Sequence, residues 1–136
     1  MKLFKYQYFL ESNQDIHSIC KKYNITNYVI NDDGTIDVNG RVSFSNNELT
    51  KLPLKFRNVT GSFNCNHNQL TTLEGSPETV GGDFYFHSNK LTTLKGSPKK
   101  IGGNFYGINN KLITLEGSPK SVGDFYCINN KLVTLE

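Results

Sequence analysis

Hydrophobic positions recur with a fixed period from about residue 38 onward. Two leucines spaced three apart return every 20 or 21 residues, and an aromatic or aliphatic pair returns ahead of them in the same register. The first leucines are Leu49, Leu70, Leu91, Leu112 and Leu132, and the second are Leu52, Leu73, Leu94, Leu115 and Leu135. A period of about 20–29 residues is typical of solenoids, whose units bury their apolar side by stacking. The pattern therefore predicts a coil of about five stacked units.

Each unit also contains a short alternating segment, such as Phe84-Tyr85-Phe86, in which two side chains face inward and one faces outward. This alternation is typical of a β-strand, and equivalent strands of successive coils are expected to pair in parallel. Glycine pairs such as Gly81-Gly82 are expected to allow the tight turn into each strand. Gly-Ser-Pro recurs at 75–77, 96–98 and 117–119 and disfavours helix on the outer side. Phe86 and Gly107 occupy equivalent positions, so we expect one ring to fill both layers.

An asparagine stands two residues before the first leucine of every unit. These residues are Asn47, Asn68, Asn89, Asn110 and Asn130. Their amides are expected to form a structural ladder with backbone groups of neighbouring coils, because a buried amide needs hydrogen-bond partners. The full pattern, F-x-[CFG]-x-x-N-x-L-x-x-L, resembles the leucine-rich repeat over residues 38–136, with Phe where leucine is usual. That resemblance implies a curved repeat solenoid with a parallel β-sheet on its concave face and little helix in the repeats.

The phrases "LEGSPK", "VGG" and "NNKL" resemble leucine-rich-repeat proteins of tailed phages. This resemblance implies a non-enzymatic viral protein that binds and blocks a host bacterial protein, such as a component of an anti-phage defence complex. The location that it implies is the host cytoplasm.

The two ends of the chain differ. Residues 1–37 are expected to form an α/β N-terminal cap, with a helix from Ser12 to Tyr23 and a β-hairpin around Asp33-Gly34. The pattern of residues 1–11 fits either helix or strand. No matching cap pattern follows the last repeat, so its strand is expected to present an open edge. One hypothesis is a homodimer through this edge, with contact residues Phe125, Tyr126, Cys127, Leu132 and Leu135, and the other is a monomer whose last coil frays.

Composition favours a single domain without catalytic chemistry. The chain has 136 residues and a formal net charge of +3, which is too weakly basic to favour tight duplex binding. Its three cysteines include no CxxC pair and suit a reducing, cytoplasmic compartment, and no run is long enough to span a membrane. The histidines, His17, His67 and His87, fall at non-equivalent positions, and no His/Cys set has metal-ligand spacing. We therefore expect no enzyme activity, cofactor or metal.

Outward positions of the predicted strands change character along the solenoid. They are small and polar in the first coils and become tyrosine, histidine and isoleucine in the later ones. Aromatic and aliphatic side chains exposed together indicate a protein-binding patch. The predicted partner-binding residues are Tyr85, Tyr106, Tyr126, His87, Ile108 and Ile128, with a lysine row beside them at Lys90, Lys111 and Lys131.

Other interpretations of this face remain open. The rings could stack only to stabilise the sheet, and the lysines could be a solvated face. Aromatic rows flanked by lysines also suit single-stranded nucleic acid, which would show a steep dependence of affinity on salt. A self-assembling accessory protein that uses the terminal coil is a further alternative.

Overall fold

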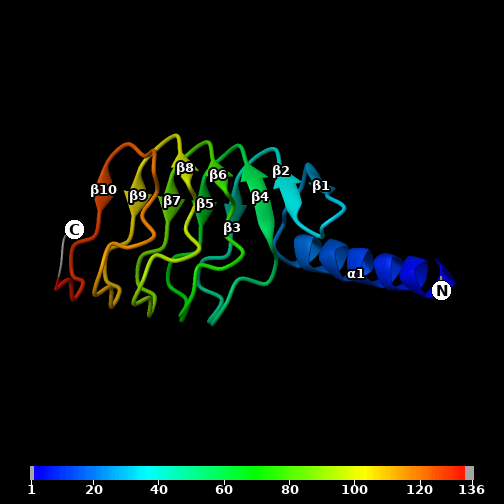
Figure 1. Ribbon diagram of the computed structural model, residues 1–136, viewed down its shortest axis with the longest axis horizontal. Helices are drawn as coiled ribbons and strands as arrows, with labels where there is room; N and C mark the ends of the chain where they lie inside the picture. The colour runs from blue at the N-terminus through cyan, green and yellow to red at the C-terminus, as the bar shows by residue number, and fades with distance from the viewer. Residues whose placement is uncertain (1, 134–136) are drawn as a thin grey trace.

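The computed structural model describes residues 2–133, with side chains from residue 12 onward. Within these residues it contains one helix, α1 (Lys2–Lys22), followed by ten short strands. The repeat is confirmed as a β-solenoid, whose coils advance from α1 at one end toward the C-terminal end (Figure 1).

One sheet is made by the alternating segments that carry the phenylalanines. All its strands are parallel, and each pairs with the equivalent residues one coil away, as Phe84 does with Phe105. Its order is β3 (Val42–Ser43), β5 (Phe63–Asn64), β7 (Phe84–Tyr85), β9 (Phe105–Tyr106) and β10 (Phe125–Tyr126). This is the five-stranded parallel sheet that the repeat predicts.

A second sheet, which the sequence analysis did not predict, lies on another side of the coils (Figure 1). Its order is β1 (Tyr28–Ile30), β2 (Ile36–Val38), β4 (Phe56–Val59), β6 (Thr79–Val80) and β8 (Lys100–Ile101). In β6 and β8 only one residue of two points inward. Strands this short contain no alternation that a sequence pattern could reveal, because each contributes one inward residue.

Side chains from both sheets and from the leucine turns meet in one core. Phe63, Phe84 and Phe105 are fully buried, and their rings stack between coils at centroid distances of 5.5 and 5.8 Å. Stacked aromatic pairs add stabilisation beyond the area that they bury. Each coil is thus attached to the next through the interior as well as through its backbone.

The prediction that the Phe86 ring fills two layers of the core, its own and that of Gly107, is confirmed. A Cβ atom on Gly107 would lie 2.0 Å from Cζ of Phe86, so the ring of one coil occupies the side-chain space of the next. Phe86 also lies with its ring centroid 4.6 Å from that of Phe105. The two positions therefore form one packing unit that spans two coils.

The glycine pairs that precede the strands do not have the role expected of them. None has a positive φ, so the expected mechanism of a conformationally demanding turn is wrong. A Cβ on Gly81 would lie 2.1 Å from the carbonyl oxygen of Thr60, and one on Gly102 would lie 2.3 Å from that of Gly81. Backbone contact between coils therefore excludes a side chain at these positions.

The helix α1 is longer than predicted. It begins at Lys2, so the predicted start at Ser12 is wrong, and Ser12 and Asp15 lie inside the helix. No glycine or proline occurs between residues 2 and 22, and most residues there tolerate helix well, so nothing in the sequence ends the helix earlier. At its C-terminal end Cys20 is fully buried and belongs to the core of the solenoid. The end of α1 thus covers the first coil.

The predicted hairpin is confirmed, since β1 and β2 pair antiparallel on either side of Asp33-Gly34. Asp33 accepts hydrogen bonds from the backbone nitrogen and the hydroxyl group of Thr35, at 3.0 and 2.6 Å. The strand β2 also pairs in parallel with β4. The expected boundary between cap and repeats, after residue 37, therefore falls within a strand that belongs to both.

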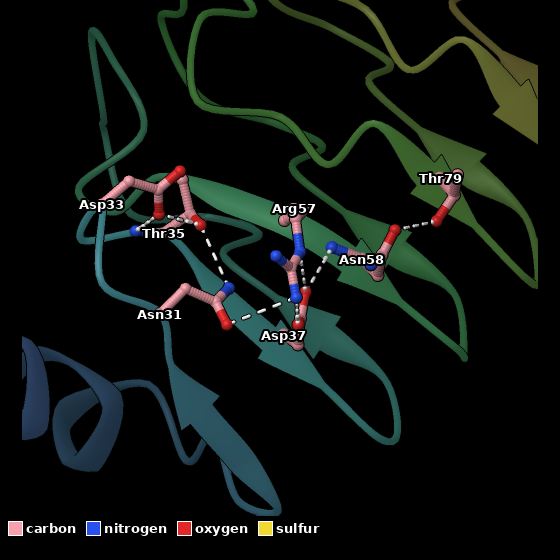
Figure 2. A network of polar contacts seen from close by, with 7 residues as sticks. All are labelled: Asn31, Asp33, Thr35, Asp37, Arg57, Asn58 and Thr79. Atoms are coloured by element: carbon pink, nitrogen blue, oxygen red, sulfur yellow. Dashed lines mark hydrogen bonds and ion pairs between the residues drawn. The ribbon is translucent and has the colours of Figure 1, made fainter.

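A polar network connects the hairpin to the first repeat (Figure 2). Arg57 of β4 forms an ion pair with Asp37 of β2 and donates a second bond, of 3.3 Å, to the side-chain oxygen of Asn31. Asp37 also accepts a bond of 3.1 Å from the backbone nitrogen of Asn58. The side-chain oxygen of Asn58 in turn accepts a bond from Thr79 in the next coil. The network therefore links three adjacent strands.

Candidate functional site

The outward side chains of the later strands of the first sheet form the candidate site. We call this surface the tyrosine face; its residues are Tyr85, His87, Tyr106, Ile108, Tyr126 and Ile128. Parallel pairing places the three tyrosines in register one coil apart. Tyr85 and Tyr106 stack at a centroid distance of 4.9 Å with an interplanar angle of 5°. Tyr106 and Tyr126 stack at 5.0 Å and 3°. The rings therefore form one continuous stack along the sheet.

Each ring is also held at its hydroxyl group by the residue two positions before it. The hydroxyl of Tyr85 donates to Asp83 at 2.9 Å, and that of Tyr126 donates to Asp124 at 3.2 Å. The hydroxyl of Tyr106 accepts a bond of 3.0 Å from the side-chain amide of Asn104. The hydrogen bond to Asp83 raises the pKa of Tyr85, because ionisation would place two negative charges together.

The anchoring residues form a ladder of their own. Asp83 accepts a bond of 2.7 Å from the backbone nitrogen of Asn104. Asn104 accepts one of 2.8 Å from the backbone nitrogen of Asp124. Each ring is therefore held by stacking and by a hydrogen bond to the residue two positions before it. Two of these residues, Asp83 and Asn104, are in turn held by the backbone of the next coil. Such side chains have little rotamer freedom left to lose on binding.

Exposure increases toward the C-terminal end of the tyrosine face. Tyr85, His87, Tyr106 and Ile108 are half-buried, whereas Tyr126 is 36% exposed and Ile128 is 64% exposed. His87 lies between two rings, with centroid distances of 6.2 Å to Tyr85 and 5.7 Å to Tyr106. Partial burial lowers the pKa of His87, so this residue is neutral near pH 7. The face thus carries aromatic and aliphatic groups without a charge at its centre.

The predicted lysine row lies just beyond the strands and is exposed. Lys90 donates a bond of 3.1 Å to the side chain of Gln69, and Lys111 and Lys131 are exposed in the following coils. Apart from the pair of Arg57 and Asp37, the described part of the chain contains no ion pair. The three ammonium groups therefore border the tyrosine face without acidic partners.

The asparagines are brought together as a ladder inside the solenoid. Asn89 donates from its amide nitrogen to the carbonyl groups of Cys65 and Phe86, at 3.0 and 3.1 Å. Its amide oxygen accepts a bond of 3.0 Å from the backbone nitrogen of Leu70. Equivalent bonds are made by Asn68, Asn110 and Asn130, while Asn47 bonds within its own coil. Asn68, Asn89 and Asn110 are buried, whereas Asn47 is exposed and Asn130 is half-buried at the two ends of the ladder.

The residues assigned to a dimer edge lie in the last described coil. The strand β10 is the outermost strand of its sheet, and Phe125 stacks on Phe105 at 4.7 Å. Phe125, Cys127 and Leu132 are only partly buried. Leu135 lies outside the described residues. The structure brings the other members together beside Tyr126 and Ile128, so this edge is continuous with the tyrosine face.

The three cysteines and the two histidines other than His87 are not among the residues that define the tyrosine face. Among the described residues, no group of His, Cys, Asp and Glu side chains could hold a metal ion. Cys20, Cys65 and Cys127 are free, and burial raises the pKa of the Cys127 thiol to about 12. His17 bonds to the hydroxyl group of Tyr28, and His67 is exposed. In the described part of the chain, no helix combines the length and the apolar character needed to cross a bilayer.

Two features of the repeats were not predicted from the sequence. The residue before each ladder asparagine has a left-handed backbone; these residues are Asn46, His67, Ser88, Asn109 and Asn129. Asn is enriched in that conformation, and its recurrence at three of these positions was an available signal. The second feature is an aliphatic change at a further row, in which Thr50, Thr71 and Thr92 are followed by Ile113 and Val133. Ile113 is 48% exposed and Val133 is 79% exposed.

Comparison of the chain with models of known protein families gives no match, and comparisons with curated proteins and with solved structures give none either. The functional argument therefore depends on the residues of the tyrosine face and their surroundings.

Proposed function

We propose that this chain is a non-enzymatic binding module that engages another protein through the tyrosine face. The observation that carries the proposal is a change of character confined to the later coils. Polar residues give way to Tyr106 and Tyr126 in one row and to Ile108 and Ile128 in the next. Aromatic and aliphatic groups that share one exposed area are typical of the centre of a protein interface.

The geometry of the rings supports a binding role beyond stabilisation of the sheet. Stacking accounts for the contact between Tyr106 and Tyr126, but it does not account for Ile128, which is 64% exposed beside them. Rings that are stacked on at least one face and hydrogen-bonded at the hydroxyl group form a rigid surface. A partner that binds such a surface loses less affinity to ordering, and tyrosine is enriched among interface hot spots.

Single-stranded nucleic acid fits the same surface less well. Base stacking needs an open ring face; Tyr106 is covered on both faces by Tyr85 and Tyr126, so only the two ends of the stack offer one. The exposed lysines favour an acidic margin on a protein partner around an apolar centre. A protein partner therefore explains more of the surface than a nucleic acid does.

The partner class that we propose comes from the resemblance of the repeat phrases to tailed-phage leucine-rich-repeat proteins. On that basis the partner is a host bacterial protein, such as an anti-phage defence component, which the bound chain would block. A homodimer through the edge at β10 would occupy Tyr126 and Ile128 and would compete with this function.

The test is capture from bacterial lysate by the immobilised chain, read by mass spectrometry. We compare the wild type with a Tyr85→Ser/Tyr106→Ser/Tyr126→Ser variant and with Val29→Asp, a control at a 65% exposed aliphatic residue of the hairpin. We expect a bacterial protein to be held by the wild type and by the control and to be lost by a folded triple variant. Equal capture by all three, or capture that disappears steeply with salt, would contradict a tyrosine-centred protein interface.

A further inference from the structure

The face has a second half, ahead of the tyrosines, where the same rows carry small polar residues. Ser43 and Asn64 occupy the positions that are equivalent to the tyrosines in the later coils. Because their side chains are smaller, the surface is lower on this side of Tyr85. The result is a hollow of about 320 Å³ lined by Arg41, Val42, Ser43, Ser62, Asn64 and Tyr85. From β3 to β7 it crosses two strand spacings, which is about 10 Å. The hollow is therefore wide enough for one side chain.

The hollow contains hydrogen-bond donors that have no acceptor among the described residues. Asn64 uses its side-chain oxygen to accept a bond of 2.9 Å from Asn66, and its amide nitrogen has no bond within the described residues. The hydroxyl oxygen of Ser62 accepts a bond of 3.0 Å from the backbone nitrogen of Asp83, which leaves its proton to donate. Each of these two oxygens thus already accepts one bond, while the hydroxyl proton and the amide nitrogen have no acceptor among the described residues.

Arg41 gives the hollow a positive charge. It is exposed, it precedes β3, and no acidic side chain in the described part of the chain pairs with it. The next acid in its row, Asp83, has one oxygen on the hydroxyl of Tyr85 and the other on the backbone of Asn104. Arg41 also lines a neighbouring polar hollow of about 490 Å³, together with Lys22 from the end of α1. No described acidic side chain lines either hollow, and the carboxylate of Asp83, in the coil after Ser62, already accepts two hydrogen bonds.

We propose that this hollow binds an anionic oxygen group, a carboxylate or a phosphate ester, on the protein segment that occupies the tyrosine face. The guanidinium group of Arg41 presents paired donors that match two oxygens of such a group. Ser62 and Asn64 supply neutral donors, and the outer face of Tyr85 supports the stem of the incoming side chain. The inference rests on the proposed function for its source of ligand, but the hollow can be tested alone.

The test is a nuclear magnetic resonance titration of the full chain with three small probes. These are N-acetylglutamate amide, N-acetylphosphoserine amide and the neutral N-acetylglutamine amide. We expect the two anionic probes to shift the backbone signals of Arg41, Ser62 and Asn64 in a saturable manner, with the neutral probe at least about tenfold weaker. The stronger of the two anions identifies the oxygen group.

Two variants and two controls complete the test. Arg41→Gln should weaken the binding of both anionic probes about tenfold, whereas Lys120→Gln, which removes the same charge from an exposed bend of a later coil, should leave it unchanged. Asn64→Asp should abolish binding by repulsion, whereas Asn109→Asp, an exposed site with the same charge change, should not. Folding of each variant is checked by the dispersion of the same spectra.

The proposal would be overturned by equal shifts with the neutral probe, by equal losses in Arg41→Gln and Lys120→Gln, or by no saturable shift at all. These outcomes are separate from failure of the tyrosine face, because the probes do not reach Tyr106 or Tyr126. Partner capture that survives Arg41→Gln but not the tyrosine substitutions would leave the proposed function standing and remove the anion site.

Discussion

Each repeat contains a ladder asparagine, preceded by a residue with a left-handed backbone that is asparagine in three of the five coils, and only the ladder residue was predictable from the sequence. The ladder residue, such as Asn89, was predictable because a buried amide at a fixed place in every unit needs backbone partners. The residue before it was not recognised, since His67 and Ser88 interrupt the run of asparagines. The left-handed backbone there follows from the turn out of the strand. The residue type at this position is therefore a weak indicator of its left-handed backbone.

Removing a ladder amide should destabilise the fold. We expect Asn89→Ala to lower the free energy of unfolding by roughly 1–3 kcal/mol, because it leaves the buried nitrogen of Leu70 without a partner and removes one of the two bonds that the carbonyl groups of Cys65 and Phe86 accept. Urea denaturation measures the change, with the exposed Thr92→Ala as control. A loss no larger than that of the control would mean that the ladder does not contribute to stability.

A substitution at Ser88 should instead stabilise the fold. Its φ of 55° lies in the left-handed region, where Asn is better tolerated than Ser. We expect Ser88→Asn to raise the free energy of unfolding by some tenths to about 1 kcal/mol, and Ser88→Val to lower it, since a β-branched residue is strained there. Thermal denaturation of both variants measures the difference, and the opposite order of stability would exclude backbone strain as the determinant.

Strands show a similar division between what sequence can and cannot predict. The strands that carry Phe-Tyr-Phe alternation were predictable, because both an inward and an outward residue recur. The second sheet was not, because β6 and β8 have two residues each and contain one core position. Its existence depends on hydrogen bonds between coils, which no local pattern encodes. The length of α1 was missed for a different reason, as a plausible cap at Ser12 lies inside an uninterrupted helix.

The network that joins the hairpin to β4 should make stability depend on pH. The hydrogen bond from Arg57 holds the pKa of Asp37 below its ordinary value of 3.8. The stabilisation is complete above 3.8 and is lost as the pH falls through the lower folded value, because the unfolded chain then binds more protons. We expect Asp37→Asn to reduce the loss of stability between about pH 5 and about pH 3.

Urea midpoints at the two pH values measure this effect. Asp33→Asn, which removes a carboxylate outside the ion pair, is measured for comparison. Equal losses in the wild type and in Asp37→Asn would show that the pair with Arg57 is not coupled to folding. Arg57→Gln should reproduce the effect of Asp37→Asn, since either change removes the same pair.

At the scale of the whole molecule, the repeat produces a surface whose chemistry varies while its backbone does not. Equal coils place unlike residues in register, from Ser43 through Asn64 to Tyr85, Tyr106 and Tyr126. The rows of this face were predictable from the period alone. Their interactions were not, because the hydrogen bonds between the tyrosine hydroxyl groups and Asp83, Asn104 and Asp124 depend on side-chain geometry. The hollow at Arg41 was missed for the same reason.

The most direct measurement is hydroxyl-radical footprinting of the chain, alone and in complex with the bacterial protein that the wild type captures. Labelling reports the exposure of individual side chains, including tyrosine and isoleucine. We expect the complex to protect Tyr126, Ile128 and Ile108 and to leave Val29, which is 65% exposed on the hairpin, unchanged. Protection of Val29 with unchanged labelling of Tyr126 and Ile128 would place the interface elsewhere and contradict binding through the tyrosine face.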